Sequence, residues 1–594
     1  MSDDVHSLDV YMHGVLAGIL ERRSQARLRF TYDEGWVAEA RPPLSLSLPV
    51  RGEPYEHEEC SPFFEGLLPE GDFLKAIART LHISADNPFQ LLTELGGECA
   101  GAISVAPAGG PQPGRDPRPP RWLSEEELAA LLAELPRRPL IAAIDEIEDG
   151  GGFRLSLAGA QDKVGVILGG DRIGLSHGRP PTTEILKPPI PHVAESVVNE
   201  AFCMSLAAHV DLDVASARPA IANSQEYLLV RRYDRGGETV DGRVHQEDFC
   251  QALGLVPAVK YEKEGGPGVA DCAELIRRHF SAPARDITAF LDALLFNFVI
   301  ANHDAHSKNY SLLLDGPGSI RLAPLYDLIS TGVFRETDRK LAMRYGGENR
   351  PAYLRGRHLD RLAADLGVKP ALVRRRAGAM WERIEAAAEE ARRSLPAEFQ
   401  DRPLLDEMLG LLAERGEALA RRAAEASESR EPAPAEGVEG GLAELDEAAE
   451  AVIGGFESLS EDLNTVGALL DGGGRDAASL AAELGRPSRD LRRHGREVYE
   501  AVVEFDSVLR RLLRTVEQEG DPGSSNAELA EPLSNMADRI GETLRAVQGL
   551  YGAITELADV SPSYREPVRS LRAGLHDMLD AQQILVEWKR QAGS

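Results

Sequence analysis

Apolar and polar positions alternate near the start of the chain, which is the period of a β-strand with one buried face. Residues 8–20 (LDVYMHGVLAGIL) show this alternation around a His-Gly pair, which predicts a hairpin. Residues 27–32 and 44–50 predict two more strands, and the second of these (LSLSLPV) alternates strictly. Helical spacing then follows, before GGECAGAISVAP returns to a short strand. We expect an α+β unit over residues 1–107.

Residues 108–425 contain both the alternation of strands and the three-to-four spacing of helices. A Pro/Gly/Arg-rich stretch at residues 108–121 is typical of an extended linker. Ser124 begins SEEELAALLAEL, which has the acidic first turn of a capped helix. Short alternating runs predict strands at residues 153–157, 164–168, 173–175, 183–188 and 226–235. Apolar positions three and four apart predict helices at residues 194–209, 287–300, 359–366, 371–391 and 404–426.

The composition changes after residue 425. Residues 426–441 are acidic and rich in Pro and Gly, which predicts a disordered linker. Residues 442–594 contain four stretches with helical apolar spacing and polar faces between, which is typical of an antiparallel bundle. The bundle carries no cluster of residues that suggests chemistry, so a structural or interaction role is expected for it.

Charge and cysteine content narrow the class of protein. The formal net charge of −30 over 594 residues disfavours non-specific nucleic-acid binding by the whole chain. Five dispersed cysteines without a CxxC pair argue against a disulfide framework or a zinc site. The sequence has no apolar run long enough to span a bilayer and no secretory signal at its start, so we expect a cytoplasmic protein without membrane contact.

Candidate chemistry lies in FNFVIANHDAHSKNYSLLL, residues 296–314. An Asp (Asp304), an Asn five residues later (Asn309) and a second Asp after a short hairpin (Asp327) follow the order of parts in a protein kinase. In such enzymes the first Asp accepts the proton of the acceptor hydroxyl, and the other two hold Mg²⁺. A solvated turn between two strands is the alternative, and this motif alone does not separate the two.

Upstream residues supply the other parts that a kinase needs. Small residues at positions 158–160 allow main-chain N–H groups to approach phosphate oxygens closely. Lys187 ends a predicted strand and is placed to reach those phosphates, with Glu200 or Glu195 as its ion-pair partner on the following helix. A plain hairpin turn and an exposed lysine are the alternatives for each part taken singly, but the order of all the parts is more specific.

These residues resemble the HipA family of serine/threonine kinases, the toxins of bacterial type II toxin–antitoxin pairs. The matching stretches span residues 8–425 and include SPFFEGLLPEG, LAGAQDK, KYEKEGGPG, NHDAHSKNYSL and LAPLYDL. The resemblance implies an α+β, two-lobed kinase-like fold with its own N-terminal subdomain (1–107) and a catalytic domain (122–425). The all-α helical bundle at 442–594 has no counterpart in the family.

The resemblance also implies roles for individual residues. Asp304 would be the catalytic base, and Asn309 and Asp327 the Mg²⁺ ligands. The residues implied to bind ATP are Ala158, Gly159, Ala160, Gln161, Asp162, Lys163, Lys187, Arg231, Arg232, Tyr233, His306, Lys308, Asn309, Tyr326 and Asp327. Arg231 departs from the family pattern, where an acidic residue is expected, and this is tolerable if the hinge contacts adenine through its main chain.

Regulation and partners follow from the same resemblance. Family members autophosphorylate a serine before the phosphate loop, here Ser156, and a phosphate there would repel ATP. The implied partners are a small helix-turn-helix antitoxin of the HipB type, operator DNA through that antitoxin, and a protein substrate such as an aminoacyl-tRNA synthetase. Basic residues at 344–357 would contact DNA phosphates or form a solvated loop.

Two other functions remain open at this stage. A small-molecule kinase of similar architecture is the first, although the FFEGLLPEG unit belongs to the protein-directed family. The second is a catalytically silent scaffold or co-repressor, against which the joint presence of Lys187, Asp304, Asn309 and Asp327 argues. The substrate, the oligomeric state and the role of the helical bundle are not set by the sequence.

Overall fold

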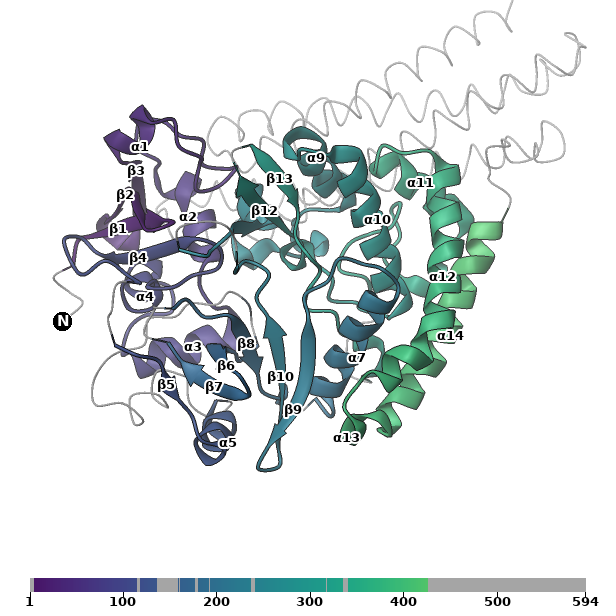
Figure 1. The fold of residues 1–594 in the computed structure, drawn as a ribbon. Coiled ribbons are helices and arrows are strands. Elements are labelled where there is room, and N and C mark those ends of the chain that lie inside the picture. The colour runs from purple at the N-terminus through teal and green to yellow at the C-terminus, as the bar shows by residue number, and fades with distance from the viewer. Residues whose placement is uncertain are drawn as a thin grey trace, which may run out of the picture. The chain divides into compact units, whose positions relative to one another are not determined.

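A computed structural model describes residues 5–114, 118–135, 159, 161–176, 180–191, 193–236, 241–316, 318–334 and 340–425 (Figure 1). The predicted bundle at 442–594, the linker before it and the predicted strand at 153–157 therefore lie outside the described residues. In the described part of the chain, no helix is long and apolar enough to cross a membrane.

The chain begins with a four-stranded antiparallel sheet in the order β3-β2-β1-β4. Its strands are β1 (Ser7–Met12), β2 (Val15–Arg22), β3 (Leu28–Tyr32) and β4 (Ile103–Pro107). His13 and Gly14 form the turn between β1 and β2 with positive φ angles of 51° and 70°, so the predicted hairpin is confirmed. The accompanying helices are α1 (Glu34–Ala38), α2 (His57–Gly66), α3 (Gly71–Thr80) and α4 (Pro88–Leu95). Phe30, Phe63 and Phe89 are fully buried in the core that these elements share.

The strand predicted at residues 44–50 is wrong. Ser45 and Leu48 form only an isolated bridge that closes a tight turn. Leu44 and Leu48 are buried, so the apolar positions do enter the core. The alternating serines turn away from a strand ladder because Ser45 and Ser47 donate hydrogen bonds to the carbonyl of Gln251, far along the chain. Side-chain bonds to another segment replaced the strand pairing that the alternation predicted.

A six-stranded antiparallel sheet follows in the order β5-β7-β6-β8-β10-β9. Its strands are β5 (Arg121–Trp122), β6 (Val164–Gly169), β7 (Arg172–Leu175), β8 (Glu184–Lys187), β9 (Ala217–Ala222) and β10 (Gln225–Arg231). Helices α5 (Glu125–Glu134) and α7 (Ser196–His209) cover its opposite faces. Along β10, Tyr227 and Leu229 pack with α5, whereas Leu228 and Val230 pack with α7. This two-sided burial follows directly from the period of two.

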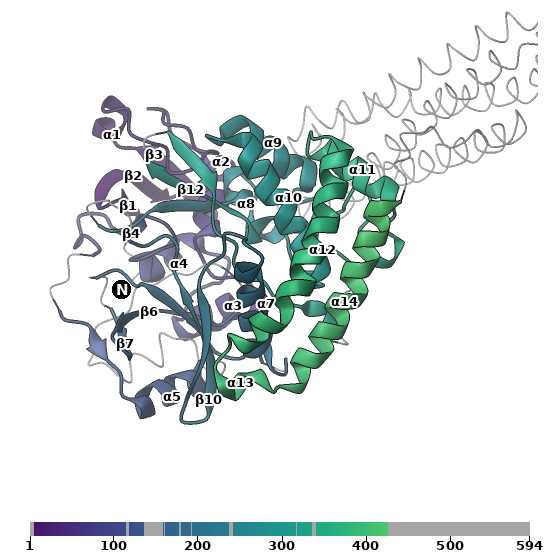
Figure 2. The ribbon, with the colours of Figure 1, turned by 45° about the vertical axis from the view of Figure 1, so that its right-hand side comes forward.

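The remaining described residues form a mainly helical lobe around the small sheet β11-β12-β13. Its strands are β11 (His245–Asp248), β12 (Ser311–Gly316) and β13 (Ser319–Leu322). Its helices are α8 (Phe249–Ala252), α9 (Val269–His279), α10 (Pro283–Val299), α11 (Gly356–Asp365), α12 (Pro370–Arg393), α13 (Ala397–Gln400) and α14 (Pro403–Ala424). The helices predicted in this region are confirmed, and α12 and α14 run side by side (Figure 2). Helix α10 is buried on nearly every side, which positions the loop that follows it.

A group of buried charges joins the N-terminal domain to the β10–β11 segment. We call Glu98, Arg232, Asp234, Arg235 and Arg243 the junction cluster. The Arg235 guanidinium donates to Glu98 Oε1 at 2.9 Å, and that of Arg232 donates to Asp234 Oδ2 at 2.8 Å. The Arg243 guanidinium donates to main-chain carbonyls of the N-terminal domain and to the Ser104 hydroxyl. Every charge in the cluster therefore has a partner at the junction.

Candidate active site

Lys187, at the end of β8, lies between two carboxylates. Its Nζ donates to Glu200 Oε1 of α7 at 2.7 Å and to Asp327 Oδ1, in the loop after β13, at 2.8 Å. We call these three residues the lysine cluster. The predicted pair with Glu200 is confirmed, whereas the alternative partner Glu195 faces Arg402 at 3.4 Å. The cluster joins the large sheet, α7 and the helical lobe.

Electrostatics distinguish the two carboxylates. Burial opposes the charge on Lys187, but Asp327 and Glu200 outweigh it and raise the pKa of the ammonium. Lys187 holds the pKa of Asp327 well below its usual range, whereas burial raises the pKa of Glu200 despite the same lysine. The Asp327 side chain is 44% exposed and that of Glu200 only 4%. Asp327 is therefore an ionised carboxylate that is open to a ligand.

Asp304 lies in the loop between α10 and the 3₁₀ turn Ser307–Asn309. Its N–H donates to Asn302 Oδ1 at 3.1 Å, and its carbonyl accepts from Asn309 Nδ2 at 3.0 Å. Its carboxylate Oδ1 accepts from the Tyr261 hydroxyl at 2.5 Å. The loop is thus fixed at its backbone and at its functional group, as a site with preorganised geometry requires.

The surroundings of Asp304 suit a proton acceptor. Burial raises the pKa of Asp304, and the hydrogen bond from Tyr261 opposes that rise. Burial and the neighbouring Asp304 charge raise the pKa of Tyr261, so the phenol keeps its proton and remains a donor. A carboxylate whose pKa moves toward neutrality is a stronger general base.

His306 and Lys308 follow Asp304 in the chain and are both buried. The His306 ring packs edge-on against Tyr261 with 5.0 Å between centroids, and burial lowers its pKa to about 3, so the imidazole is neutral. Lys308 Nζ donates to Asp248 Oδ2 at 2.5 Å and lies 3.5 Å from Glu70 Oε1. Its predicted contact with a nucleotide stays a prediction.

The predicted phosphate loop is described at Gly159 and from Gln161 to Lys163, whereas Ser156, Ala158 and Ala160 lie outside the described residues. Gly159 has a φ of +113°, and a Cβ there would lie 2.5 Å from Lys163 Nζ, so glycine fits both the backbone and the space. Burial, followed by the charge of Lys187, lowers the pKa of Lys163 to about 8. Burial raises the pKa of Asp162, and Gln161 donates to the Pro188 carbonyl at 3.3 Å. Gly159 and Lys163 thus meet next to the lysine cluster.

The predicted hinge, Arg231 to Tyr233, follows β10. Main-chain N–H groups of Arg231 and Arg232 donate to the carbonyls of Ser216 and Thr183 at 2.8 and 2.9 Å. The Arg232 side chain belongs to the junction cluster. The Tyr233 ring lies 5.8 Å from that of Tyr326, next to Asp327, and the Tyr326 hydroxyl donates to the Lys308 carbonyl at 2.7 Å. The two tyrosines connect the hinge to the lysine cluster.

Asn309 and Asp327 fit the predicted magnesium ligands by their chemistry. Asn309 uses its NH₂ group as a donor to Asp304, which leaves its amide oxygen as an acceptor. Mg²⁺ prefers such oxygens and takes one or two carboxylates together with substrate phosphates. Among the described residues, no group of three or more His, Cys, Asp or Glu side chains forms a metal site. A phosphate-bridged ion does not require such a group.

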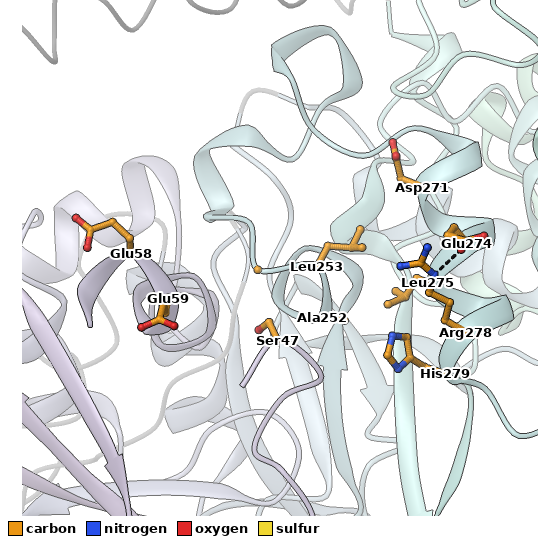
Figure 3. A pocket seen from close by; sticks show the side chains of 11 residues that line it. Ser47, Glu58, Glu59, Ala252, Leu253, Asp271, Glu274, Leu275, Arg278 and His279 are labelled. Carbon is orange, nitrogen blue, oxygen red and sulfur yellow. Dashed lines mark hydrogen bonds and ion pairs between the residues drawn. The ribbon is translucent and has the colours of Figure 1, made fainter. Parts of the chain in front are cut away.

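A separate cavity of about 490 Å³ lies between the N-terminal domain and α9 (Figure 3). Its carboxylates are already engaged: Glu58 with Arg27, Glu59 with Arg51, Glu274 with Arg278, and Asp271 with the Gly268 N–H. None of the predicted catalytic residues lines it. The predicted chemistry therefore does not lie in this cavity.

Reasoning from sequence missed four residues that contact the site: Glu70, Asp248, Lys260 and Tyr261. Glu70 and the Lys260–Tyr261 pair fall within SPFFEGLLPEG and KYEKEGGPG, stretches that match the family but received no role. Their contacts with Asp304 and Lys308 span 43 to 238 positions of sequence. No local pattern carries such a distant pairing.

Comparison with known proteins now bears on the family. Residues 8–106 match the HipA N-terminal domain, and residues 155–391 match the HipA-like C-terminal domain. The putative kinase Y4mE of Sinorhizobium fredii is 42% identical over 66% of this chain and 92% of its own length. This chain belongs to the HipA family.

Two further HipA-family comparisons agree. The serine/threonine-protein kinase toxin HipA of Shewanella oneidensis is 32% identical over 60% of this chain and 83% of its own length. A solved structure of the Shewanella oneidensis toxin–antitoxin system contains HipA, HipB and operator DNA. It matches this chain with a TM-score of 0.58 and 27% identity, and the match covers 70% of this chain and 96% of the matched chain. The α+β fold of the HipA type is thus confirmed for the described part, and the relatives support a kinase-like toxin.

Proposed function

We propose that this protein is an ATP- and Mg²⁺-dependent serine/threonine protein kinase that acts as a toxin. The observation that carries the proposal is Lys187 held between Glu200 and Asp327. A kinase needs a strand lysine fixed by a helix glutamate, together with an ionised aspartate for the metal. The two contacts join the sheet, α7 and the helical lobe, and the one with Asp327 brings together residues 140 positions apart in the chain.

The described side chains support a separate role for each residue in phosphoryl transfer. Asp304 accepts the proton of a serine or threonine hydroxyl as that oxygen attacks the γ-phosphorus of ATP. The bond from the γ-phosphorus to the bridging oxygen breaks, and ADP leaves with that oxygen. Lys187 neutralises charge on the phosphates, and Mg²⁺ bound by Asn309 and Asp327 would supply further positive charge there.

Nucleotide binding is proposed to use the hinge and the loop before β6. The N–H groups of Arg231 and Arg232 already have acceptors, so adenine is proposed to contact the main-chain carbonyls of this segment and the Tyr233 N–H. This explains why an arginine is compatible with position 231, since its side chain is not required for such a contact. Gly159 to Lys163, with Ala158 and Ala160, would surround the phosphates, and phosphorylation of Ser156 would repel ATP.

The proposed partner is a HipB-like antitoxin, because the matched Shewanella oneidensis structure holds HipA together with HipB and operator DNA. Any contact with operator DNA by this chain is proposed to occur through that antitoxin. The acceptor is proposed to be a cellular protein.

Transfer of labelled phosphate from ATP tests the proposal. We expect the wild-type chain to label itself or a lysate protein, and Asp304→Asn to lower the rate about 10²- to 10⁴-fold, the usual contribution of a general base. Asp406→Asn is the matched control, because Asp406 is 70% exposed and its ion pair within the described residues is with Arg392 in α12. Wild-type protein without Asp304-dependent transfer would leave a catalytically silent scaffold.

A further inference from the structure

A segment of the N-terminal domain reaches the candidate active site. Pro69 forms a parallel bridge with Gly159, and the Glu70 N–H donates to the Gly159 carbonyl at 3.0 Å. Gly71 follows with a φ of +60° and begins α3. A main-chain bond from the N-terminal domain therefore holds Gly159, which has a positive φ and lies close to Lys163 Nζ.

The side chain of Glu70 points toward the loop that contains Asp304 and Lys308. We call residues 304–310 the catalytic loop. Its Oε2 accepts from Lys260 Nζ at 2.9 Å, and its Oε1 lies 3.5 Å from Lys308 Nζ. All three side chains are largely buried: Glu70 is 12% exposed, Lys260 18% and Lys308 5%. Burial opposes the charge on Glu70, but Lys308 and Lys260 outweigh it and lower the pKa of the carboxyl, so it is ionised.

Each of the two lysines is next in the chain to a residue that donates a hydrogen bond to Asp304. Lys260 precedes Tyr261, which donates to the Asp304 carboxylate. The Lys260 carbonyl also accepts from the Ser307 hydroxyl at 3.0 Å, and this serine begins the turn that carries Lys308. Lys308 precedes Asn309, which donates to the Asp304 carbonyl. Two short paths of contacts therefore connect Glu70 with Asp304.

We propose that Glu70 is a positioning residue for phosphoryl transfer: its main chain fixes the phosphate loop at Gly159, and its carboxylate fixes the catalytic loop through Lys260 and Lys308. The N-terminal domain then sets the separation between the nucleotide phosphates and Asp304. This inference rests on the proposed kinase function. An ordinary interdomain ion pair is the simpler alternative, and it predicts loss of stability without loss of turnover.

Glu70→Gln separates these outcomes, because it removes the charge and keeps both the shape and the main-chain bond to Gly159. Glu247→Gln is the control for a Glu-to-Gln exchange at a buried interdomain position: the Glu247 carboxyl group contacts Ser45 and Leu46 and neither of the two loops. We expect Glu70→Gln to lower kcat at least about 10-fold while KM for ATP changes less than about 3-fold, since lost alignment acts on the transition state. Glu247→Gln should stay within twofold of wild type in both constants.

A double-mutant cycle with Lys260→Gln sharpens the test. If Glu70 acts through Lys260, the double variant loses less than the product of the two single losses. Multiplicative losses, or a kcat for Glu70→Gln equal to that of Glu247→Gln per folded molecule, would overturn the proposal.

Hydrogen exchange gives a readout that does not depend on activity. Glu70→Gln should speed exchange of peptides containing Tyr261 and residues 304–310, while peptides from β9 and β10 stay as in wild type. Unchanged exchange in the catalytic loop would contradict the inference even if the kinase function failed. Conversely, Asp304-dependent transfer in wild type with normal turnover in Glu70→Gln would remove the inference and leave the function intact.

Discussion

The junction cluster and the lysine cluster both bury charged side chains, but they differ in how completely those charges are enclosed. In the junction cluster, the paired side chains of Glu98, Arg232, Asp234 and Arg235 are only 2–6% exposed. Asp234 receives a further hydrogen bond from the Gly101 N–H at 2.7 Å, in addition to its arginines. In the lysine cluster, Lys187 and Glu200 are equally enclosed, but Asp327 is 44% exposed.

This difference separates a structural role from a functional one. A buried ion pair whose members are fully satisfied fixes the arrangement of two segments, and removal of one partner destabilises the fold. An ionised carboxylate that is left open beside a buried lysine keeps capacity for a ligand. The same residue types thus predict loss of stability at the junction and loss of activity at the lysine cluster.

Among the variants that compare the two clusters, Asp327→Asn is expected to have the largest effect on activity. The variant removes the open charge while Lys187 keeps Glu200 as its partner. We expect turnover to fall at least about 100-fold, the usual cost of one lost electrostatic contact to the transition state. The free energy of unfolding should change less than it does when a fully enclosed ion pair loses one partner, because Asp327 is 44% exposed and Lys187 keeps Glu200 as a partner. Initial rates and urea unfolding measure both, and a large loss of stability with normal turnover would erase the distinction between the clusters.

Arg243→Met should show the opposite pattern. The change removes one hydrogen-bond donor from each of the carbonyls of Cys99, Gly101 and Ile103, at a site that is closed to water. We expect the free energy of unfolding to fall by about 2–4 kcal/mol, with turnover per folded molecule within twofold of wild type. Arg350→Met is the control, because Arg350 is 53% exposed and pairs with Glu348 at the surface, so its loss should leave the free energy of unfolding close to that of wild type.

The sequence predicted the lysine cluster far better than the junction cluster. Lys187 ends β8, Glu200 lies inside α7, and Asp304 and Asp327 lie in the loops after α10 and β13. The hydrophobic period of these elements is clear, so the order of the four residues along the chain reproduces the order of parts in a kinase. The pair between Lys187 and Glu200 was predicted because strand and helix are consecutive. By contrast, Arg232 was assigned to the hinge, and its side-chain bonds to Glu98 and the Cys99 carbonyl carried no local signal.

Long-range side-chain pairing explains the other failures as well. Residues 44–50 alternate as a strand does, but Glu247 and Gln251, about 200 positions away, accept the hydrogen bonds of this segment. Glu70 reaches the site for the same reason, through Lys260 and Lys308. Period and propensity describe the burial of a segment against its neighbours in sequence, whereas these contacts depend on the packing of one domain against another.

Glu247 lies outside the junction cluster but is also a buried carboxyl group between the N-terminal domain and β11. Its partners are hydrogen-bond donors rather than cations, so we expect a smaller effect on stability than at Arg243. Ser45 Oγ and Glu247 Oε2 lie 2.5 Å apart, and the Leu46 N–H donates to Oε1 at 2.9 Å. Burial raises the pKa of Glu247 to about 8, and these hydrogen bonds only partly oppose the rise.

The folded protein therefore keeps a proton on Glu247 between about pH 4.5 and 8, whereas the unfolded chain releases it. The stabilisation from this group is fully present below about pH 4.5, and it is lost as the pH rises through 8. Glu247→Gln mimics the protonated acid at every pH, so the variant should gain about 1 kcal/mol or more relative to wild type between pH 6 and pH 8. Urea unfolding of both proteins from pH 5 to 9 measures this difference. If the difference in free energy of unfolding between the two proteins stayed constant from pH 5 to 9, Glu247 would be ionised in the folded protein. Burial of a carboxyl group between these two segments would then not by itself decide its charge.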